Sequence, residues 1–252
     1  MFNISNIKTI SFKIISFILS AEIFFSCQTV KLKPESSNNS VIDKKELIFK
    51  AEPDPFSSLV ELETKYGKMK IELFFEQGEH RANFLKLAKN RTLDSTIFHR
   101  VIKNFMIQGG DPTTKNAKPG QRVGANSSGT ELFSEINNKY YHIKGALAAA
   151  RQPDEVNPEK KSSGSQFYIV HGSPVNDDQL DKFERELGIA YSPEQRKLYK
   201  MLGGSPQLDM NYTVFGRVYE GYNVIDSIAG QMTDGNDRPQ TDIKIALKVI
   251  KE

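Results

Sequence analysis

The sequence predicts a mainly β domain of short antiparallel strands with a few helices, spanning residues 57–252. Three patterns carry this prediction. Two apolar segments alternate with polar residues on either side of residues 66–68, a later apolar run stops at a Gly-Gly-Asp-Pro turn, and helical spacing is confined to a few segments. The length suits a single hydrophobic core.

The alternating pair indicates a β-hairpin with one buried face, and an amphipathic helix follows it. The buried positions of the hairpin are Val60, Leu62, Thr64, Met69, Ile71 and Leu73. The helix is predicted over residues 79–90, where Ala82, Phe84, Leu85, Leu87 and Ala88 share one side at helical spacing. We expect this helix to plug one end of a barrel.

Residues 98–111, FHRVIKNFMIQGGD, are predicted to form a buried strand that ends in a turn. Glycine allows positive φ, and the proline that follows cannot donate to a β-ladder. One interpretation is a pocket wall, with Phe105 and Met106 as its apolar surface and Arg100 and Gln108 as its polar groups. The other is a core strand with the stem of Arg100 lying along its edge.

Residues 174–206 are predicted to form a helical hairpin between two strands that carry pocket residues. The first helix covers residues 177–188, with Gly188 as its stop. The second begins at Ser192, has Pro193 in its first turn and Gln195 completing a capping box, and ends at residues 203–204. This insert is either a surface decoration or a lid or specificity element.

Residues 1–26 have the pattern of an export signal. Lys8 and Lys13 precede an apolar run over residues 14–25, which is too short to span a bilayer. The one cysteine, Cys27, follows this run, where bacterial lipoproteins carry the cysteine that is lipidated after cleavage. We therefore expect a lipid anchor to a membrane of the cell envelope, on the periplasmic side. A soluble periplasmic or secreted protein and an uncleaved anchor are the alternatives.

Residues 27–56 are predicted to be a flexible tether, because Ser, Asn, Pro and charged residues dominate them. Residues 46–49 form its one short apolar patch that could dock. Since Cys27 is the only cysteine, no disulfide is expected, and the fold must depend on its core.

The composition argues against several functional classes. The chain has 34 basic and 31 acidic residues, a net charge of +3 and no basic run, so no nucleic-acid partner is expected. His80, His99, His142 and His171 lack the paired spacing of a zinc site, and we expect neither a metal nor another cofactor. The sequence also lacks a serine-hydrolase elbow and a glycine-rich phosphate loop.

Four blocks of the sequence resemble the cyclophilins, a family of peptidyl-prolyl cis/trans isomerases. FHR with FM.QGGD is similar to the family's signature, and the following blocks are GALAAAR at 145–151, SGSQFYI at 163–169 and TVFGRV at 213–218. The resemblance implies a closed eight-stranded antiparallel barrel capped by helices. It also implies isomerisation of Xaa-Pro bonds in proline-containing polypeptides, here exported proteins, by a monomer.

The resemblance, carried over motif by motif, implies a set of catalytic and substrate-binding residues. The catalytic residues are Arg100, Phe105 and Gln108, and the substrate-binding residues are Met106, Ala150, Arg151, Gln166, Tyr168, Leu208 and Tyr212. Arg151, Tyr168 and Tyr212 stand where the best-known eukaryotic members have Asn, Phe and His. Gln207 stands in place of a Trp important for cyclosporin binding, so tight binding of cyclosporin is not expected.

Two functions remain open from the sequence. The first is a non-covalent isomerase in which Arg100 donates a hydrogen bond to the proline nitrogen of the twisted peptide. The second is a non-catalytic module of the cell envelope that grips proline-containing segments, with the insert as its interface. The presence of Arg100, Phe105, Met106 and Gln108 together favours the enzyme.

Overall fold

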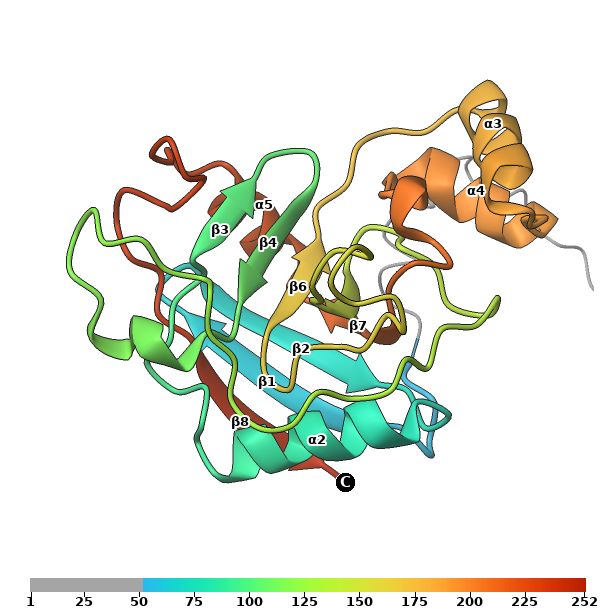
Figure 1. Ribbon diagram of the computed structural model, residues 1–252. Coiled ribbons are helices and arrows are strands. Elements are labelled where there is room, and N and C mark those ends of the chain that lie inside the picture. Colours follow the sequence, from blue (N-terminus) through green and yellow to red (C-terminus); the bar gives the residue numbers. More distant parts are fainter. Residues whose placement is uncertain (1–51) are drawn as a thin grey trace, which may run out of the picture. The chain divides into compact units, whose positions relative to one another are not determined.

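The computed structural model describes residues 52–252, so the leader, Cys27 and most of the tether lie outside the described residues. Within that part, eight strands form one antiparallel sheet in the order β3-β4-β6-β5-β7-β2-β1-β8 (Figure 1). The strands are β1 (Ser58–Thr64), β2 (Gly67–Leu73), β3 (Arg100–Ile102), β4 (Met106–Gly109), β5 (Ala146–Ala149), β6 (Phe167–Val170), β7 (Val214–Glu220) and β8 (Ala246–Lys251). No helix in residues 52–252 is long and apolar enough to cross a membrane.

The predicted first hairpin is present as β1 and β2. Val60 lies opposite Ile71 and Leu62 opposite Met69, and all four side chains are fully buried. Successive side chains of a strand point to opposite faces, so the alternation with polar residues places one face of the hairpin in the main core.

Two of the four α-helices in residues 52–252 complete the main core. The α-helices are α2 (Gly78–Lys89), α3 (Asp177–Leu187), α4 (Pro193–Leu202) and α5 (Tyr222–Ala229), and the 3-10 helices are η1 (Pro112–Asn116) and η2 (Pro206–Leu208). Helix α2 packs against β1, β7 and β8, below the strands in Figure 1, and α5 packs against β2, β3 and β4. Phe84 of α2 and Ile225 of α5 are buried there, whereas Ala82 is exposed.

The prediction of a closed barrel is wrong, because the sheet is an open half-barrel. Strands β3 and β8 are its two edges and do not pair with each other. Just before these strands begin, the backbone N–H of Phe98 donates to Ile243 (3.0 Å) and Ile97 forms an isolated bridge with Lys244. Two further backbone hydrogen bonds join Ile245 to Ser95 and Thr96 (both 2.8 Å), but these contacts do not continue as a ladder between β3 and β8.

The region predicted as one buried strand, residues 98–111, is instead a tight hairpin of β3 and β4. Its turn lies at residues 103–105, where Asn104 has a φ of 64° and the N–H of Phe105 donates to the carbonyl of Ile102 (3.1 Å). Asparagine tolerates this left-handed conformation. Asn104 was therefore the residue within VIKNFM that indicated a turn, but the apolar residues around it led to the prediction of a single strand. The predicted end of the run is correct, because β4 stops at Gly109 and Gly110 has a φ of 92°.

The two helices predicted in the insert are present. Helix α3 ends at Gly188, which adopts the left-handed conformation, and α4 begins with a complete capping box between Ser192 and Gln195. The residues that begin and end these helices lie within the local sequence, so the two helices could be predicted without knowledge of distant contacts.

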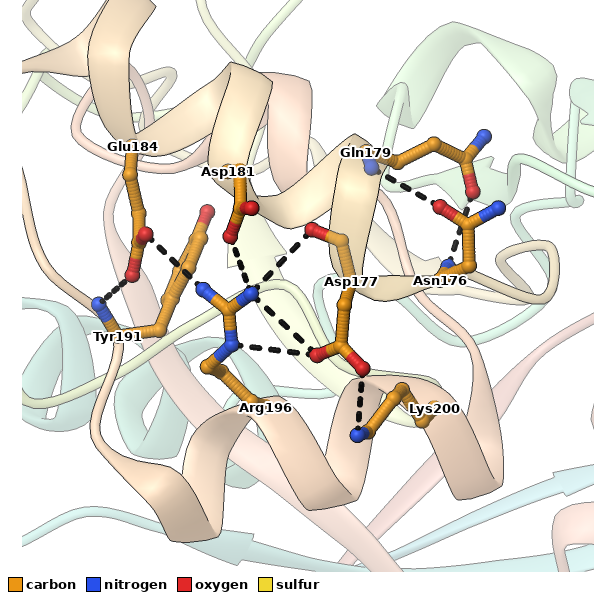
Figure 2. Close-up of polar contacts among 8 residues, drawn as sticks. All are labelled: Asn176, Asp177, Gln179, Asp181, Glu184, Tyr191, Arg196 and Lys200. Atoms are coloured by element: carbon orange, nitrogen blue, oxygen red, sulfur yellow. Dashed lines mark hydrogen bonds and ion pairs between the residues drawn. The ribbon is translucent and has the colours of Figure 1, made fainter.

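Helices α3 and α4 are joined by an ion-pair cluster centred on Arg196 (Figure 2). The guanidinium of Arg196 contacts the carboxylates of Asp177 (3.3 Å), Glu184 (2.9 Å) and Asp181. Glu184 also accepts a hydrogen bond from the backbone N–H of Tyr191, 2.6 Å away, in the loop between the helices. Arg196 therefore links α4 to three carboxylates of α3.

We expect replacement of Arg196 by methionine to lower the free energy of unfolding by about 1 to 2 kcal/mol, because three neighbouring carboxylates lose their shared cation. Denaturant unfolding measures this change. The matched control is Lys197→Met on the same helix, whose ion pair with Glu194 is long (3.9 Å) and exposed. A loss no larger for Arg196→Met than for the control would contradict this role.

His99 is a buried histidine that supports the loop over residues 112–130. A Cβ on Gly124 would lie 2.8 Å from its ring, so the loop backbone packs directly on the imidazole. Neither ring nitrogen has a hydrogen-bond partner within the described residues. Burial lowers the pKa of His99 from its ordinary value of 6.5 to about 4, because the charged imidazolium is poorly solvated there.

This pKa shift predicts acid sensitivity between about pH 6.5 and pH 4. The unfolded chain binds the proton more readily than the folded chain, so stability is full above that window and falls as the pH falls through it. The expected contribution is roughly 3 kcal/mol at most. Denaturant unfolding at pH 7 and pH 4 should show a smaller difference in His99→Gln than in the wild type, and equal differences would refute the assignment.

Candidate active site

The sequence-predicted site lies on one face of the strands β3, β4, β6 and β5. Residues directly opposite one another across these four strands are Arg100, Gln108, Tyr168 and Ala148. The neighbouring row, one residue along each strand, is Val101, Ile107, Ile169 and Leu147, and it is buried in the main core. Alternation therefore assigns one face to the core and the other to the candidate site.

Six of the ten predicted site residues meet in a second apolar cluster on this face. They are Phe105, Met106, Ala150, Tyr168, Leu208 and Tyr212. Met106, Ala150 and Tyr168 are buried, whereas the other three are only partly buried. The cluster thus offers an apolar surface that remains partly open.

Arg100 stands at the edge of this cluster and is not part of it. Its side chain is 44% exposed, and its Nε lies 3.4 Å from a carboxylate oxygen of Asp237. Because Arg100 is directly opposite Gln108 on the neighbouring strand, the guanidinium and the amide belong to the same face. A hydrogen-bond donor thus lies beside an apolar surface.

Gln108 and Gln166 form a fixed pair. The side-chain N–H of Gln108 donates to the amide oxygen of Gln166 (2.9 Å), and Gln166 donates in turn to the carbonyls of Gly124 (3.0 Å) and Asn126 (2.7 Å). Gln166 therefore connects the strands to the 112–130 loop and holds that loop against the site.

Arg151, which the resemblance implies binds substrate, makes several contacts within the protein. Its side chain is 5% exposed, its guanidinium stacks on the ring of Tyr212 at 4.6 Å, and its Nε donates to the carbonyl of Asn211 (2.7 Å). A nearby carboxylate, Asp154, completes its contacts at 2.5 Å. Arg151 positions Tyr212 and the segment around it, a role that the resemblance did not suggest.

Two buried residues that sequence reasoning missed support Tyr168. The Oη of Tyr168 lies 2.9 Å from His142 Nε2, and His142 Nδ1 lies 2.8 Å from a carboxylate oxygen of Asp209. Burial raises the pKa of Tyr168 well above its usual range, so the hydroxyl keeps its proton. His142 and Asp209 are 67 residues apart in the sequence, and no local motif connects them.

The arrangement suits non-covalent binding of a small apolar group next to hydrogen-bond donors. Within residues 52–252, no three His, Cys, Asp or Glu side chains are grouped in a way that could hold a metal ion. The residues on this face are apolar, amide and guanidinium groups, which bind and orient a ligand without forming a covalent bond to it.

Comparisons with known proteins agree with this geometry. Residues 59–249 match the family model "Cyclophilin type peptidyl-prolyl cis-trans isomerase/CLD". A Streptococcus pyogenes protein, whose name joins a phosphatase to a peptidyl-prolyl cis-trans isomerase, is 38% identical over 190 residues, which are 74% of this chain but only 37% of that protein. The Arabidopsis thaliana peptidyl-prolyl cis-trans isomerase CYP18-2 is 30% identical over 77% of this chain and 94% of its own.

A crystal structure also matches. The cyclophilin-type peptidyl-prolyl cis-trans isomerase of Cryptosporidium parvum, crystallised in the presence of the dipeptide Ala-Pro, superimposes with a TM-score of 0.56 at 26% identity, covering 77% of this chain and 99% of that one. The family model covers most of the chain and the relatives agree with it, so this chain belongs to the cyclophilin-type peptidyl-prolyl cis-trans isomerases.

Proposed function

We propose that this chain catalyses cis/trans isomerisation of Xaa-Pro bonds at the face formed by β3, β4, β6 and β5, with Arg100 as the catalytic donor. One observation carries the proposal: Arg100 and Gln108 lie opposite each other beside the apolar cluster that contains Phe105, Met106 and Leu208. Membership in the isomerase family and the Ala-Pro dipeptide used with the related C. parvum protein support it.

The reaction needs no covalent step. Rotation about the prolyl peptide bond has a barrier of about 18 to 20 kcal/mol, because the amide loses its resonance as it twists. In the twisted state the proline nitrogen becomes pyramidal and carries a lone pair. A donor aimed at that nitrogen therefore stabilises the transition state far more than the planar ground state.

Arg100 is the donor that fits this role. Its guanidinium is accessible, permanently charged and restrained on one side by Asp237. A hydrogen bond from a charged group contributes about 1.5 to 3 kcal/mol net, which corresponds to one to two powers of ten in rate. The guanidinium alone is therefore insufficient, and the surrounding surface must supply the remainder.

The apolar cluster and the two glutamines supply that remainder. Phe105, Met106 and Leu208 would hold the proline ring, while Gln108, fixed by Gln166, would orient the peptide backbone. Holding one side of the bond while the flanking carbonyl rotates removes orientational freedom that the free peptide must lose, and the apolar surface excludes water from the twisting amide.

The substrates that we propose are exported proteins, reached by a lipid-anchored enzyme. The support is the sequence alone, namely the apolar run over residues 14–25 directly before Cys27 and the polar tether over residues 27–56. A tether of this kind would let the domain act at a distance from the membrane surface.

Replacing Arg100 by alanine should lower kcat/KM on a short Xaa-Pro peptide about tenfold to a hundredfold, because the transition-state hydrogen bond is lost. The kcat/KM of Arg100→Lys should lie between those of the wild type and Arg100→Ala, since lysine keeps the charge but lacks the planar guanidinium. NMR exchange spectroscopy of the peptide measures the rates, and circular dichroism checks the fold.

Arg185→Ala is the matched control, because Arg185 is an exposed arginine on the insert helix α3 and should leave the rate unchanged. A wild-type protein that shifts the peptide resonances without accelerating exchange would reject the enzyme in favour of a non-catalytic proline-binding module. An equal rate in Arg100→Ala and wild type would reject Arg100 as the donor.

Changing Cys27 to serine tests the anchor. In a bacterial host, the wild type should incorporate labelled fatty acid and sediment with the membranes, whereas Cys27→Ser should lose the label and leave the membrane fraction. Membrane retention by the unlabelled variant would indicate an uncleaved anchor, and soluble wild type would indicate a free exported protein.

A further inference from the structure

We propose that the α3–α4 insert positions a wall of the isomerase site, through a buried hydrogen-bond chain that runs from Tyr191 and Tyr199 to Tyr168. This inference rests on the proposed function, because it concerns how the proline-binding surface is held. It assigns the insert a role other than decoration or a moving lid, and it makes Tyr191, Tyr199, Asp209 and His142 positioning residues.

The chain of contacts is continuous. The hydroxyls of Tyr191 and Tyr199 lie 2.7 and 2.5 Å from the same carboxylate oxygen of Asp209. The other carboxylate oxygen accepts the backbone N–H of His142 at 2.8 Å and lies 2.8 Å from Nδ1 of that ring. His142 Nε2 then lies 2.9 Å from the hydroxyl of Tyr168.

Every member of this chain is buried, with exposed fractions of 5% or less. Burial and the nearby Asp209 raise the pKa values of Tyr191 and Tyr199, so both hydroxyls keep their protons and donate them to the carboxylate. Because buried polar groups must satisfy one another, removal of one donor affects the partners that follow.

The donors determine the direction of every hydrogen bond. A carboxylate only accepts, so Asp209 requires the proton of His142 to be on Nδ1. In the neutral imidazole that we propose, Nε2 is then the acceptor, and the hydroxyl of Tyr168 donates to it. The Tyr168 proton therefore points towards His142, and the ring of Tyr168 is held in the apolar cluster with Met106 and Leu208.

The insert is held rigidly enough to serve this purpose. The Arg196 cluster joins its two helices, and Glu184 of that cluster binds the backbone of Tyr191 (Figure 2). At its base, Gly204 forms bridges with both Ile143 and Ser173. A Cβ on Gly204 would lie 2.5 Å from the Tyr199 ring, so Tyr199 packs directly on this backbone.

Loss of the two tyrosine hydroxyls should loosen the hydrogen bonds next to the site. Asp209 would keep only the two bonds that His142 makes to one of its oxygens, and its other oxygen would be buried without a donor. The carboxylate would then no longer be held in one orientation. His142, and the Tyr168 hydroxyl bonded to it, would lose their fixed positions.

The first test reads the tautomer of His142 directly. Ring 15N NMR of the purified wild-type protein should show Nδ1 protonated and Nε2 unprotonated, and Tyr191→Phe with Tyr199→Phe should shift or broaden the two ring nitrogen signals, because the imidazole loses its fixed position. A wild-type protein with protonated Nε2 would overturn the proposal. This wild-type measurement does not depend on whether any variant folds or on whether the protein is an isomerase.

The second test is a double-mutant cycle on kcat/KM for a proline peptide. Tyr191→Phe with Tyr199→Phe should lower kcat/KM about three- to tenfold in the wild type but less than about twofold when Tyr168 is already phenylalanine. A merely structural role would give equal losses in both backgrounds and would overturn the proposal. If the variant with both changes does not fold, Tyr191→Phe alone is used in the same cycle.

Tyr141→Phe is the matched control. Tyr141 packs against the ring of Tyr191 at 5.2 Å in the same buried cluster but makes no hydrogen bond to Asp209. It should change neither the ring nitrogen signals of His142 nor kcat/KM, and a loss equal to that of the Tyr191 and Tyr199 changes would count against a specific chain. Failure of the proposed function itself is distinguishable, because the wild type would then not accelerate isomerisation at all.

Discussion

The alternation of side chains along β3, β4, β6 and β5 is the constraint on which both the core and the candidate site depend. One row of residues, such as Val101 and Ile107, fills the main core, and the next, with Arg100 and Gln108, faces the site. A shift of one residue would bury the guanidinium and expose the core. Gly110 prevents a clash at the end of β4, because a Cβ there would lie 2.2 Å from the carbonyl of Ser165.

Most polar side chains around the apolar cluster make hydrogen bonds or stacking contacts to other parts of the protein. Gln166 uses its amide on Gln108 and the 112–130 loop, and Arg151 uses its guanidinium on Tyr212 and neighbouring carbonyls. Arg100, at the outer edge, pairs with Asp237 at 3.4 Å and keeps 44% of its side chain exposed, which is why we propose it as the donor. Rigid surroundings and one accessible donor suit a reaction that depends on orientation and transition-state electrostatics.

The insert joins this organisation through Asp209, which follows directly after Leu208 of the apolar cluster. The carboxylate is satisfied by two tyrosines from the insert and by His142, so the insert and the site share one buried polar network. Such a network stabilises one arrangement only when all its members are paired. We therefore infer that the insert supports the proposed site.

Features with local causes could be predicted from the sequence alone. Alternation predicted β1 and β2, capping residues predicted α3 and α4, and motif blocks indicated the cyclophilin family and the residues that gather around Met106 and Tyr168. Three features became evident only in the structure: the open sheet edge, the internal contacts of Arg151, and the chain from Tyr199 through Asp209 to His142. These features depend on contacts between distant segments, and a contact across 67 residues leaves no periodic or capping signal in the sequence.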